Sequence, residues 1–299
     1  MASPDIHQTA DSSPGTIADR ALSLAASFWR PVLALALLTY IPQAILHFNT
    51  ATAWVNLYGH TVPTGTGHPD IFDWATTEIE ENRLGLGNWP AVDIVHDVLL
   101  LLAAGLIAVY VSDWMGRRRA KFSETLARLS ERWHVVALCV AAMAAIMFSV
   151  RDAFDMLTSW YFNVDVNAVD PTFLVMLDVI RPFWSIVISF AELLALVLGI
   201  SIVASAVLDE GSVGESFIEG LVASLNRRSW FRTMLFTAAF VVLYRIASWA
   251  SIGATLVLNA THSPLLDTFV YVAVYALPTA FVVMTTVTSY VDLTELPAP

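Results

Sequence analysis

The stretch VDIVHDVLLLLAAGLIAVYVSDWM, residues 92–115, decides the fold of this chain. Its central part carries no charge, and its length meets the need of about 20 residues for a helix that crosses about 30 Å of hydrocarbon. Five further stretches follow the same rule: Pro31–Phe48, Val135–Leu157, Pro182–Val207, Thr233–Leu258 and Leu265–Tyr290. The sequence therefore predicts an all-α, polytopic membrane helix bundle with six transmembrane helices.

The composition agrees with six spans. The 299 residues are 57% hydrophobic with a mean hydropathy of +0.65, and only 14% are charged, about half the usual share. The single cysteine, Cys139, lies inside the third span, so neither an intrachain disulfide nor a thiolate metal cluster can form. No phosphate-binding glycine loop and no serine-nucleophile elbow is present. We therefore expect no catalytic residue, no metal and no cofactor.

The distribution of basic residues predicts the orientation, because Lys and Arg in short loops stay on the cytoplasmic side. Eleven of the 15 basic residues fall on one side of the predicted topology: Arg20, Arg30, Arg117, Arg118, Arg119, Lys121, Arg128, Arg132, Arg227, Arg228 and Arg232. The opposite segments hold Arg83, Arg151 and Arg181 among clusters of acids. Both ends of the chain are therefore predicted to be cytoplasmic, in a bacterial cytoplasmic (inner) membrane. With a net charge of −11, no nucleic-acid partner is expected.

The segments outside the spans complete the predicted organisation. Residues 1–16 are rich in Ser, Pro, Asp and Thr and are typical of a disordered tail rather than a secretory signal. Residues 17–290 form the membrane domain, with an outer loop at 49–91, and residues 291–299 form a C-terminal tail. Three cytoplasmic helices are expected, at about 17–29, 121–133 and 213–230.

A threefold repetition predicts these cytoplasmic helices. Each copy opens with a small residue and an acid, as helix N-termini prefer, and ends in aromatic and mostly basic residues suited to headgroups. Each copy then enters an odd-numbered span, so we expect interfacial amphipathic helices. The second copy is surrounded by six basic residues: Arg117, Arg118, Arg119, Lys121, Arg128 and Arg132. They are candidate contacts for anionic lipid headgroups, or alternatively act only in setting the orientation.

Two motifs carry a family resemblance. Residues 112–126, SDWMGRRRAKFSETL, and residues 206–217, AVLDEGSVGESF, are similar to the bacterial membrane domain that precedes the catalytic domain of some glycerophosphodiester phosphodiesterases. The resemblance covers most of residues 17–290. It implies a stand-alone membrane domain, and we expect no phosphodiesterase barrel because only nine residues follow the last span.

Ionisable residues inside spans are costly and are functional candidates. Glu192 and Arg245 both fall near the predicted bilayer midplane, where they form a structural ion pair, line a substrate or proton pathway, or do not meet. His96 and Asp97, at the start of the second span, are either a polar cap or a proton-transfer pair. Polar residues at helical spacing extend the candidate pathway: Ser185, Ser189, Ser248, Tyr271 and Tyr275.

Three functions are compatible with this pattern. The first is a non-catalytic integral membrane protein associated with lipid or membrane organisation, whose partners are anionic lipid headgroups. The second is a transporter or permease for a small or amphipathic solute, using the polar faces of the fourth to sixth spans. The third, an intramembrane enzyme, lacks a recognisable catalytic motif. The sequence itself favours the first.

Overall fold

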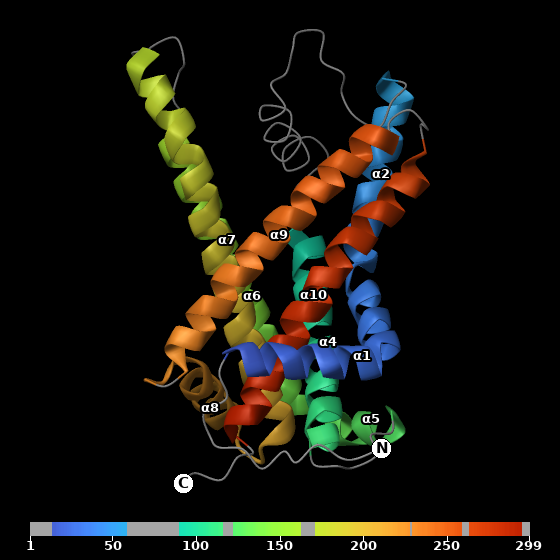
Figure 1. Cartoon of the computed structure of the whole chain (residues 1–299), viewed down its shortest axis with the longest axis vertical. Helices are drawn as coiled ribbons and strands as arrows, with labels where there is room; N and C mark the ends of the chain where they lie inside the picture. Colours follow the sequence, from blue (N-terminus) through green and yellow to red (C-terminus); the bar gives the residue numbers. More distant parts are fainter. Residues whose placement is uncertain are drawn as a thin grey trace.

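The computed structural model describes residues 14–58, 90–115, 122–162, 171–227, 229–258 and 263–294, which form nine helices and no strand. The helices are α1 (Pro14–Thr39), α2 (Ile41–Tyr58), α4 (Pro90–Met115), α5 (Phe122–Glu131), α6 (Trp133–Phe162), α7 (Pro171–Leu208), α8 (Val213–Leu225), α9 (Trp230–Leu258) and α10 (Pro264–Thr294) (Figure 1). Most of the predicted tail, outer loop and C-terminal tail lies outside these residues, and α1 begins at Pro14, within the predicted tail.

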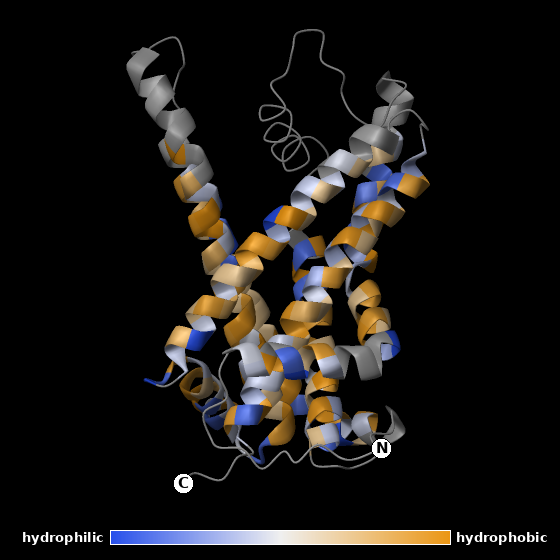
Figure 2. Cartoon of the chain, viewed as in Figure 1, coloured by the Kyte–Doolittle hydropathy of each residue, from blue (hydrophilic) through white to orange (hydrophobic). Residues whose placement is uncertain are grey.

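Within the described part of the chain, five helices are long and apolar enough to cross a membrane. The apolar segments are Val92–Met115, Trp133–Thr158, Phe183–Leu208, Trp230–Ser251 and Pro264–Thr294. A sixth span forms if the bent pair Arg30–Thr39 and Ile41–Asn49 counts as one. Hydrophobic residues run along these helices (Figure 2). The chain is therefore an all-α polytopic membrane helix bundle, which confirms the predicted fold class.

The first predicted span is broken rather than continuous. The segments on either side of Tyr40 meet at a bend of 49°. Pro42 explains the break, because it has no N–H to donate to the carbonyl of Leu38 and its ring clashes with that carbonyl in a continuous helix. The backbone N–H of Tyr40 instead donates to the carbonyl of Leu37 at 3.1 Å, closing a tight turn. This break places the end of α1 beside the start of α4.

The core lies where α4, α7 and α10 pack together, with α6 and α9 on its flanks. Small residues allow close approach: a Cβ on Gly105 of α4 would lie 3.2 Å from the side chain of Val203 of α7. Side chains such as Ile200 and Val282 are fully buried there. Close packing of small residues is the usual basis of helix association in a membrane, where apolar contact alone offers no advantage over lipid.

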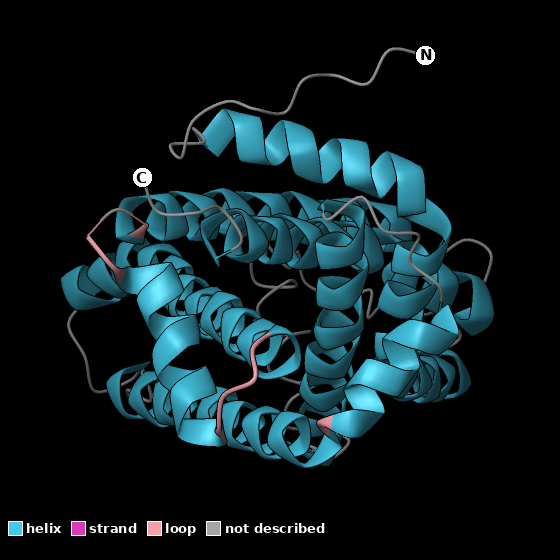
Figure 3. Cartoon of the chain, turned by 90° about the horizontal axis from the view of Figure 1, so that it is seen from below, coloured by secondary structure: helices cyan, strands magenta, loops and turns pink. Residues whose placement is uncertain are grey.

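The short helices α5 and α8 gather at one end of the bundle, which we call the α8 end (Figure 1). The start of α1 and the end of α10 reach the same end, and the first part of α1 lies across the bundle rather than along it (Figures 1 and 3). Helix α5 ends at Glu131 rather than 133, and α8 begins at the expected Val213 but ends at Leu225 rather than 230.

Helix α8 begins with a capping box. The Ser212 side chain accepts a hydrogen bond from the Glu215 backbone N–H, while the Glu215 carboxylate accepts one from the Ser212 N–H at 2.5 Å. The bond from the Ser212 backbone holds the pKa of Glu215 below its usual value. On the buried face of α8, a Cβ on Gly220 would lie 2.6 Å from the Cα of Ile202 of α7. Glycine at 220 therefore sets the distance between α8 and α7.

Replacing Gly220 with alanine is expected to destabilise the protein, because the new methyl group meets backbone that cannot move aside. Overpacking of this kind costs about 1–3 kcal/mol, which exceeds the gain of about 1 kcal/mol in helix propensity. Gly214→Ala is the matched control on the same helix, since nothing lies within 4 Å of its Cβ position. Thermal unfolding in detergent should show a lower midpoint for Gly220→Ala only. Equal midpoints for the two variants would contradict the packing argument.

Candidate functional site

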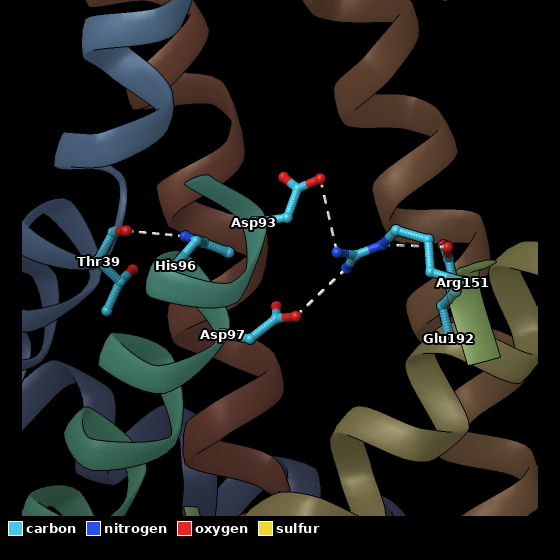
Figure 4. Close-up of polar contacts among 6 residues, drawn as sticks. All are labelled: Thr39, Asp93, His96, Asp97, Arg151 and Glu192. Atoms are coloured by element: carbon cyan, nitrogen blue, oxygen red, sulfur yellow. Dashed lines mark hydrogen bonds and ion pairs between the residues drawn. The ribbon is translucent and has the colours of Figure 1, made fainter. Parts of the chain in front are cut away.

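A cluster of ionisable side chains lies where α4, α6 and α7 meet. The guanidinium of Arg151, on α6, faces two carboxylates of α4 and one of α7 (Figure 4). Its nitrogens lie 3.6 Å from an oxygen of Asp93, 3.4 Å from one of Asp97 and 3.6 Å from one of Glu192. All four residues fall inside the apolar segments that are long enough to span a membrane. We call these four residues the carboxylate–arginine cluster.

The helix geometry explains why these residues meet. Asp93 and Asp97 are four positions apart on α4, so both carboxylates point from one face. Helices α6 and α7 follow each other in the chain and run in opposite directions, so a residue late in α6 meets one early in the apolar part of α7. Asp93 also lies in the first turn of α4, where a negative charge offsets the positive end of the helix dipole.

The cluster is sealed at one side and open at the other. The side chain of Asp97 is 4% exposed, whereas those of Arg151, Glu192 and Asp93 are 23%, 31% and 44% exposed. Asp97 therefore forms the closed side, and Asp93 lies at the rim. Asp93 is therefore the most accessible of the four side chains.

The charges within the cluster do not balance. Three carboxylates face one guanidinium, and burying an unbalanced charge in a membrane is costly. The contacts of 3.4–3.6 Å are longer than the 2.7–2.9 Å of a strong charge-assisted bond, and Nη1 of Arg151 is buried without a hydrogen-bond partner. The cluster therefore has excess negative charge and incomplete hydrogen bonding, which is a poor arrangement for a purely structural ion pair.

A hydrogen bond ties this region to the broken helix. Nδ1 of His96 lies 2.7 Å from the carbonyl oxygen of Thr39, one of the carbonyls that the end of α1 leaves without a helical partner (Figure 4). Because a carbonyl only accepts, Nδ1 of His96 must carry the proton. The ring of Tyr40 packs against His96 with centroids 4.7 Å apart. His96 thus contacts the end of α1, whereas Asp97 contacts Arg151, so the two neighbours have different partners.

Of the alternatives left open for Glu192 and Arg245, the structure shows contacts of each residue with other partners. Glu192 faces Arg151 of α6, and Arg245 of α9 donates hydrogen bonds to Ser185 and Ser189 of α7 at 2.9 and 3.0 Å. The reason is the direction of the side chains around α7, which points Glu192 toward α6. Arg245 meets hydroxyl groups rather than a carboxylate, and the structure brings it together with two residues of the predicted polar stripe.

The polar residues of α10 face a different set of helices. The ring of Tyr271 stacks on His47 of α2 with centroids 4.4 Å apart, and Tyr275 packs beside it at 4.9 Å. His47 also lies 3.0 Å from the carboxylate of Asp267. Ser248, on α9, is half-buried. The serines of α7 therefore contact Arg245 of α9, whereas Tyr271 of α10 contacts His47 of α2.

Two of the six predicted lipid contacts bind protein groups. Arg128 of α5 forms an ion pair of 2.9 Å with Asp113 of α4, and Arg132 donates to the carbonyl of Gly211. Asp113 is buried, so Arg128 compensates a charge inside the protein. The other four, Arg117, Arg118, Arg119 and Lys121, lie outside the described residues.

Sequence reasoning missed Arg151 as the centre of a site. The signal was present, because Arg151 falls within the predicted third span, where any ionisable residue is a functional candidate. It was assigned to the outer segment instead, together with the acids that follow it. The spacing of Asp93 and Asp97 was a second signal, since two acids four positions apart share one helix face.

Comparisons with protein-family models, with curated proteins and with solved structures found no match to this chain.

Proposed function

We propose that this multi-pass membrane protein is a transporter or permease for a small or amphipathic solute, and that the carboxylate–arginine cluster binds the positive charge that is moved. That charge belongs either to a cationic group of the solute or to a coupled proton. The observation that carries the proposal is that, among the described residues, several carboxylates face the single guanidinium of Arg151, inside segments that are long enough to span a membrane. A cation that entered the cluster would restore the balance.

The surroundings of the cluster support transport in two ways. The rim at Asp93 is nearly half exposed, so a solute can reach the guanidinium and its acids. The break between α1 and α2 lies next to the same part of α4, through the bond between His96 and Thr39. Broken helices beside buried charges are a recurring feature of transporter binding sites. Among the described residues, no group of three or more His, Cys, Asp or Glu side chains is arranged to hold a metal ion, which favours an organic cation or a proton.

Asp97→Asn is expected to reduce transport at least tenfold, because it removes the most buried negative charge of the cluster while keeping a side chain of the same shape. The measurement is uptake of labelled amines and guanidines into proteoliposomes, with a trapped pH dye to report proton movement. Asp152→Asn is the matched control, since Asp152 is exposed on the same helix as Arg151. If no solute or proton enters faster than in empty liposomes, or if both variants behave alike, the transport proposal fails.

Lipid association is the second candidate, and helix α8 is the observation that favours it. The helix buries a face of small residues against the bundle and leaves an apolar face exposed at spacings of three and four. The exposed side chains are Ile218, Leu221, Val222 and Leu225. A helix with an unpaired apolar face at the end of a membrane bundle is suited to lie in the lipid interface. In this proposal the partners are anionic lipid headgroups, and α1, α5 and α8 are interfacial helices.

Neutralising Arg117, Arg118 and Arg119 together is expected to weaken binding to anionic vesicles. The loss should be larger at low salt, because exposed charges are screened within about 8 Å at physiological ionic strength. Flotation of detergent-purified protein with phosphatidylglycerol vesicles measures the effect, and phosphatidylcholine vesicles are the control. Unchanged retention would leave these three arginines with a role in orientation only.

We also propose a family and a cellular location for this protein. The motifs at residues 112–126 and 206–217 support a relation to the membrane domain of glycerophosphodiester phosphodiesterases. The basic residues around 117–132 support a bacterial inner membrane with both ends of the chain in the cytoplasm.

A further inference from the structure

Among the described residues, Arg232 at the α8 end of the bundle has two buried nitrogen atoms without a hydrogen-bond partner. Arg232, in the first turn of α9, is 9% exposed, and its Nε and Nη2 atoms are buried with no acceptor. A guanidinium presents five N–H donors in a planar fork that matches the oxygens of a carboxylate or a phosphate. Leaving two of these nitrogens without an acceptor costs free energy, so the arrangement indicates a missing acceptor.

The charges around Arg232 leave it with an excess positive charge. The acid whose field acts on Arg232 is Asp292 of α10, which is itself buried. Asp292 already forms an ion pair with Arg20 of α1. Asp292 therefore pairs directly with Arg20 and acts on Arg232 through its electric field. The sign is opposite to that of the carboxylate–arginine cluster, so the ligand that balances this site is an anion.

The position of Arg232 matches the level of lipid headgroups. The neighbouring side chains of Trp230 and Phe231 are exposed, as aromatic residues at the boundary of a membrane span are. Arg232 also lies in the first turn of α9, where the positive end of the helix dipole attracts negative charge. An anionic oxygen group at this level is available from phospholipids.

A polar group at the same end of the bundle, the hydroxyl of Thr286, also lacks a partner among the described residues. Thr233 and Thr286 line a cavity of about 10 Å³ between α7, α8, α9 and α10. The hydroxyl of Thr286 is buried without a hydrogen-bond partner, whereas that of Thr233 donates to the carbonyl of Ser224. The cavity is large enough for about one water molecule. This part of the bundle is therefore polar and incompletely bonded next to Arg232.

We propose that Arg232, assisted by Arg20, binds one phosphate group at the α8 end of the bundle. The phosphate oxygens accept hydrogen bonds from Nε and Nη2 of Arg232, and the negative charge balances the second guanidinium. The site is separate from the proposed transport site and from the lipid contacts proposed at residues 117–132. The phosphate comes either from the headgroup of an anionic phospholipid or from free phosphate in solution.

The test is a thermal-shift titration of the purified, delipidated protein with three probes. These are inorganic phosphate, dioctanoyl phosphatidylglycerol and dioctanoylglycerol, which has the same acyl chains without a phosphate. A lipid site predicts stabilisation by phosphatidylglycerol alone, whereas a site for free phosphate predicts stabilisation by inorganic phosphate as well. Arg232→Gln should weaken the apparent affinity at least tenfold. Arg227→Gln, which removes the same charge from an exposed position at the same end, should match the wild type.

Two further variants keep the proposal testable if Arg232→Gln does not fold. Asp292→Asn removes the competing carboxylate, so the affinity for the phosphate-bearing probe should rise. Arg20→Gln frees Asp292 to pair with Arg232, so the affinity should fall. A purely structural ion pair would lower the melting temperature in both variants without opposite effects on the titration.

Several outcomes would overturn the proposal. The first is a wild-type protein that no phosphate-bearing probe stabilises more than dioctanoylglycerol does. The second is an equal loss of affinity in Arg227→Gln and Arg232→Gln, which would indicate nonspecific attraction. The third is an experimental structure in lipid with only an ordered water at Nε and Nη2 of Arg232.

Discussion

Replacing Arg151 with methionine is expected to lower the free energy of unfolding by about 3 kcal/mol, the lower end of the range for breaking a buried ion pair. The variant leaves three carboxylates facing one another with no compensating charge, and Asp97 among them is 4% exposed. The loss lies at the lower end of this energy range because Asp93 and Glu192 are partly exposed and can be solvated. Methionine retains most of the side-chain volume, so the loss reports charge rather than packing. Chemical or thermal unfolding in a mild detergent measures it.

A double-mutant cycle identifies which carboxylate depends most on Arg151. Asp97→Asn combined with Arg151→Met should recover much of the loss, because neutralising the most buried acid removes the largest part of the uncompensated charge. Asp93→Asn should recover less, since Asp93 is nearly half exposed. Asp152→Asn, one position from Arg151 and exposed, should not recover any. Additive effects of Arg151→Met and Asp97→Asn would show that the 3.4 Å contact contributes nothing to stability.

The spans could be predicted from the sequence because hydrocarbon thickness imposes a length that composition reveals directly. Val92–Met115 coincides with the predicted second span, and the last apolar helix, Pro264–Thr294, contains the predicted sixth span, Leu265–Tyr290. The break at Tyr40 was not predicted, although Pro42 was visible. Pro42 marks the place of a break, but the partner of the freed Thr39 carbonyl, His96, is far away in the sequence.

The candidate site was predicted only in part, for a geometric reason. Counting residues along a span gives the depth of Glu192 and Arg245 in the membrane, but it does not give the direction of each side chain around its helix. Glu192 points toward α6 and therefore meets Arg151, whereas Arg245 meets Ser185 and Ser189. Two charges at similar depth on neighbouring helices need not face each other. Only the packing of α4, α6 and α7 determines which side chains meet.

The role of the basic residues at 117–132 could be predicted only in part. Six basic residues close together predict a surface for anionic lipid, because a sequence shows charge but not pairing. The structure gives Arg128 a buried acid as its partner, Asp113, fifteen positions earlier in the chain. A buried acid near the end of a span was the missing signal, since such an acid needs a cation from an adjacent helix.

Replacing Arg128 with methionine is expected to lower the free energy of unfolding by about 2 kcal/mol, the usual contribution of a hydrogen bond to a charged group. The variant leaves Asp113, which is 3% exposed, without its partner at 2.9 Å. Asp113→Asn in the same chain should recover most of the loss, because a neutral amide needs no cation. Thermal unfolding of the two single variants and the double variant measures the coupling.

The same variants separate a structural role of Arg128 from lipid binding. If Arg128 serves mainly as a headgroup contact, Arg128→Met should lower retention on anionic vesicles while its melting temperature stays at the wild-type value. If Arg128 serves mainly to compensate Asp113, the melting temperature should fall, and Arg128→Met combined with Asp113→Asn should restore stability without changing lipid retention. The pairing of a half-exposed guanidinium with a deeply buried carboxylate leads us to expect the second result, because the buried charge loses more without its partner than the solvated one. A wild-type melting temperature in Arg128→Met would show that Asp113 is stable without a cation beside it.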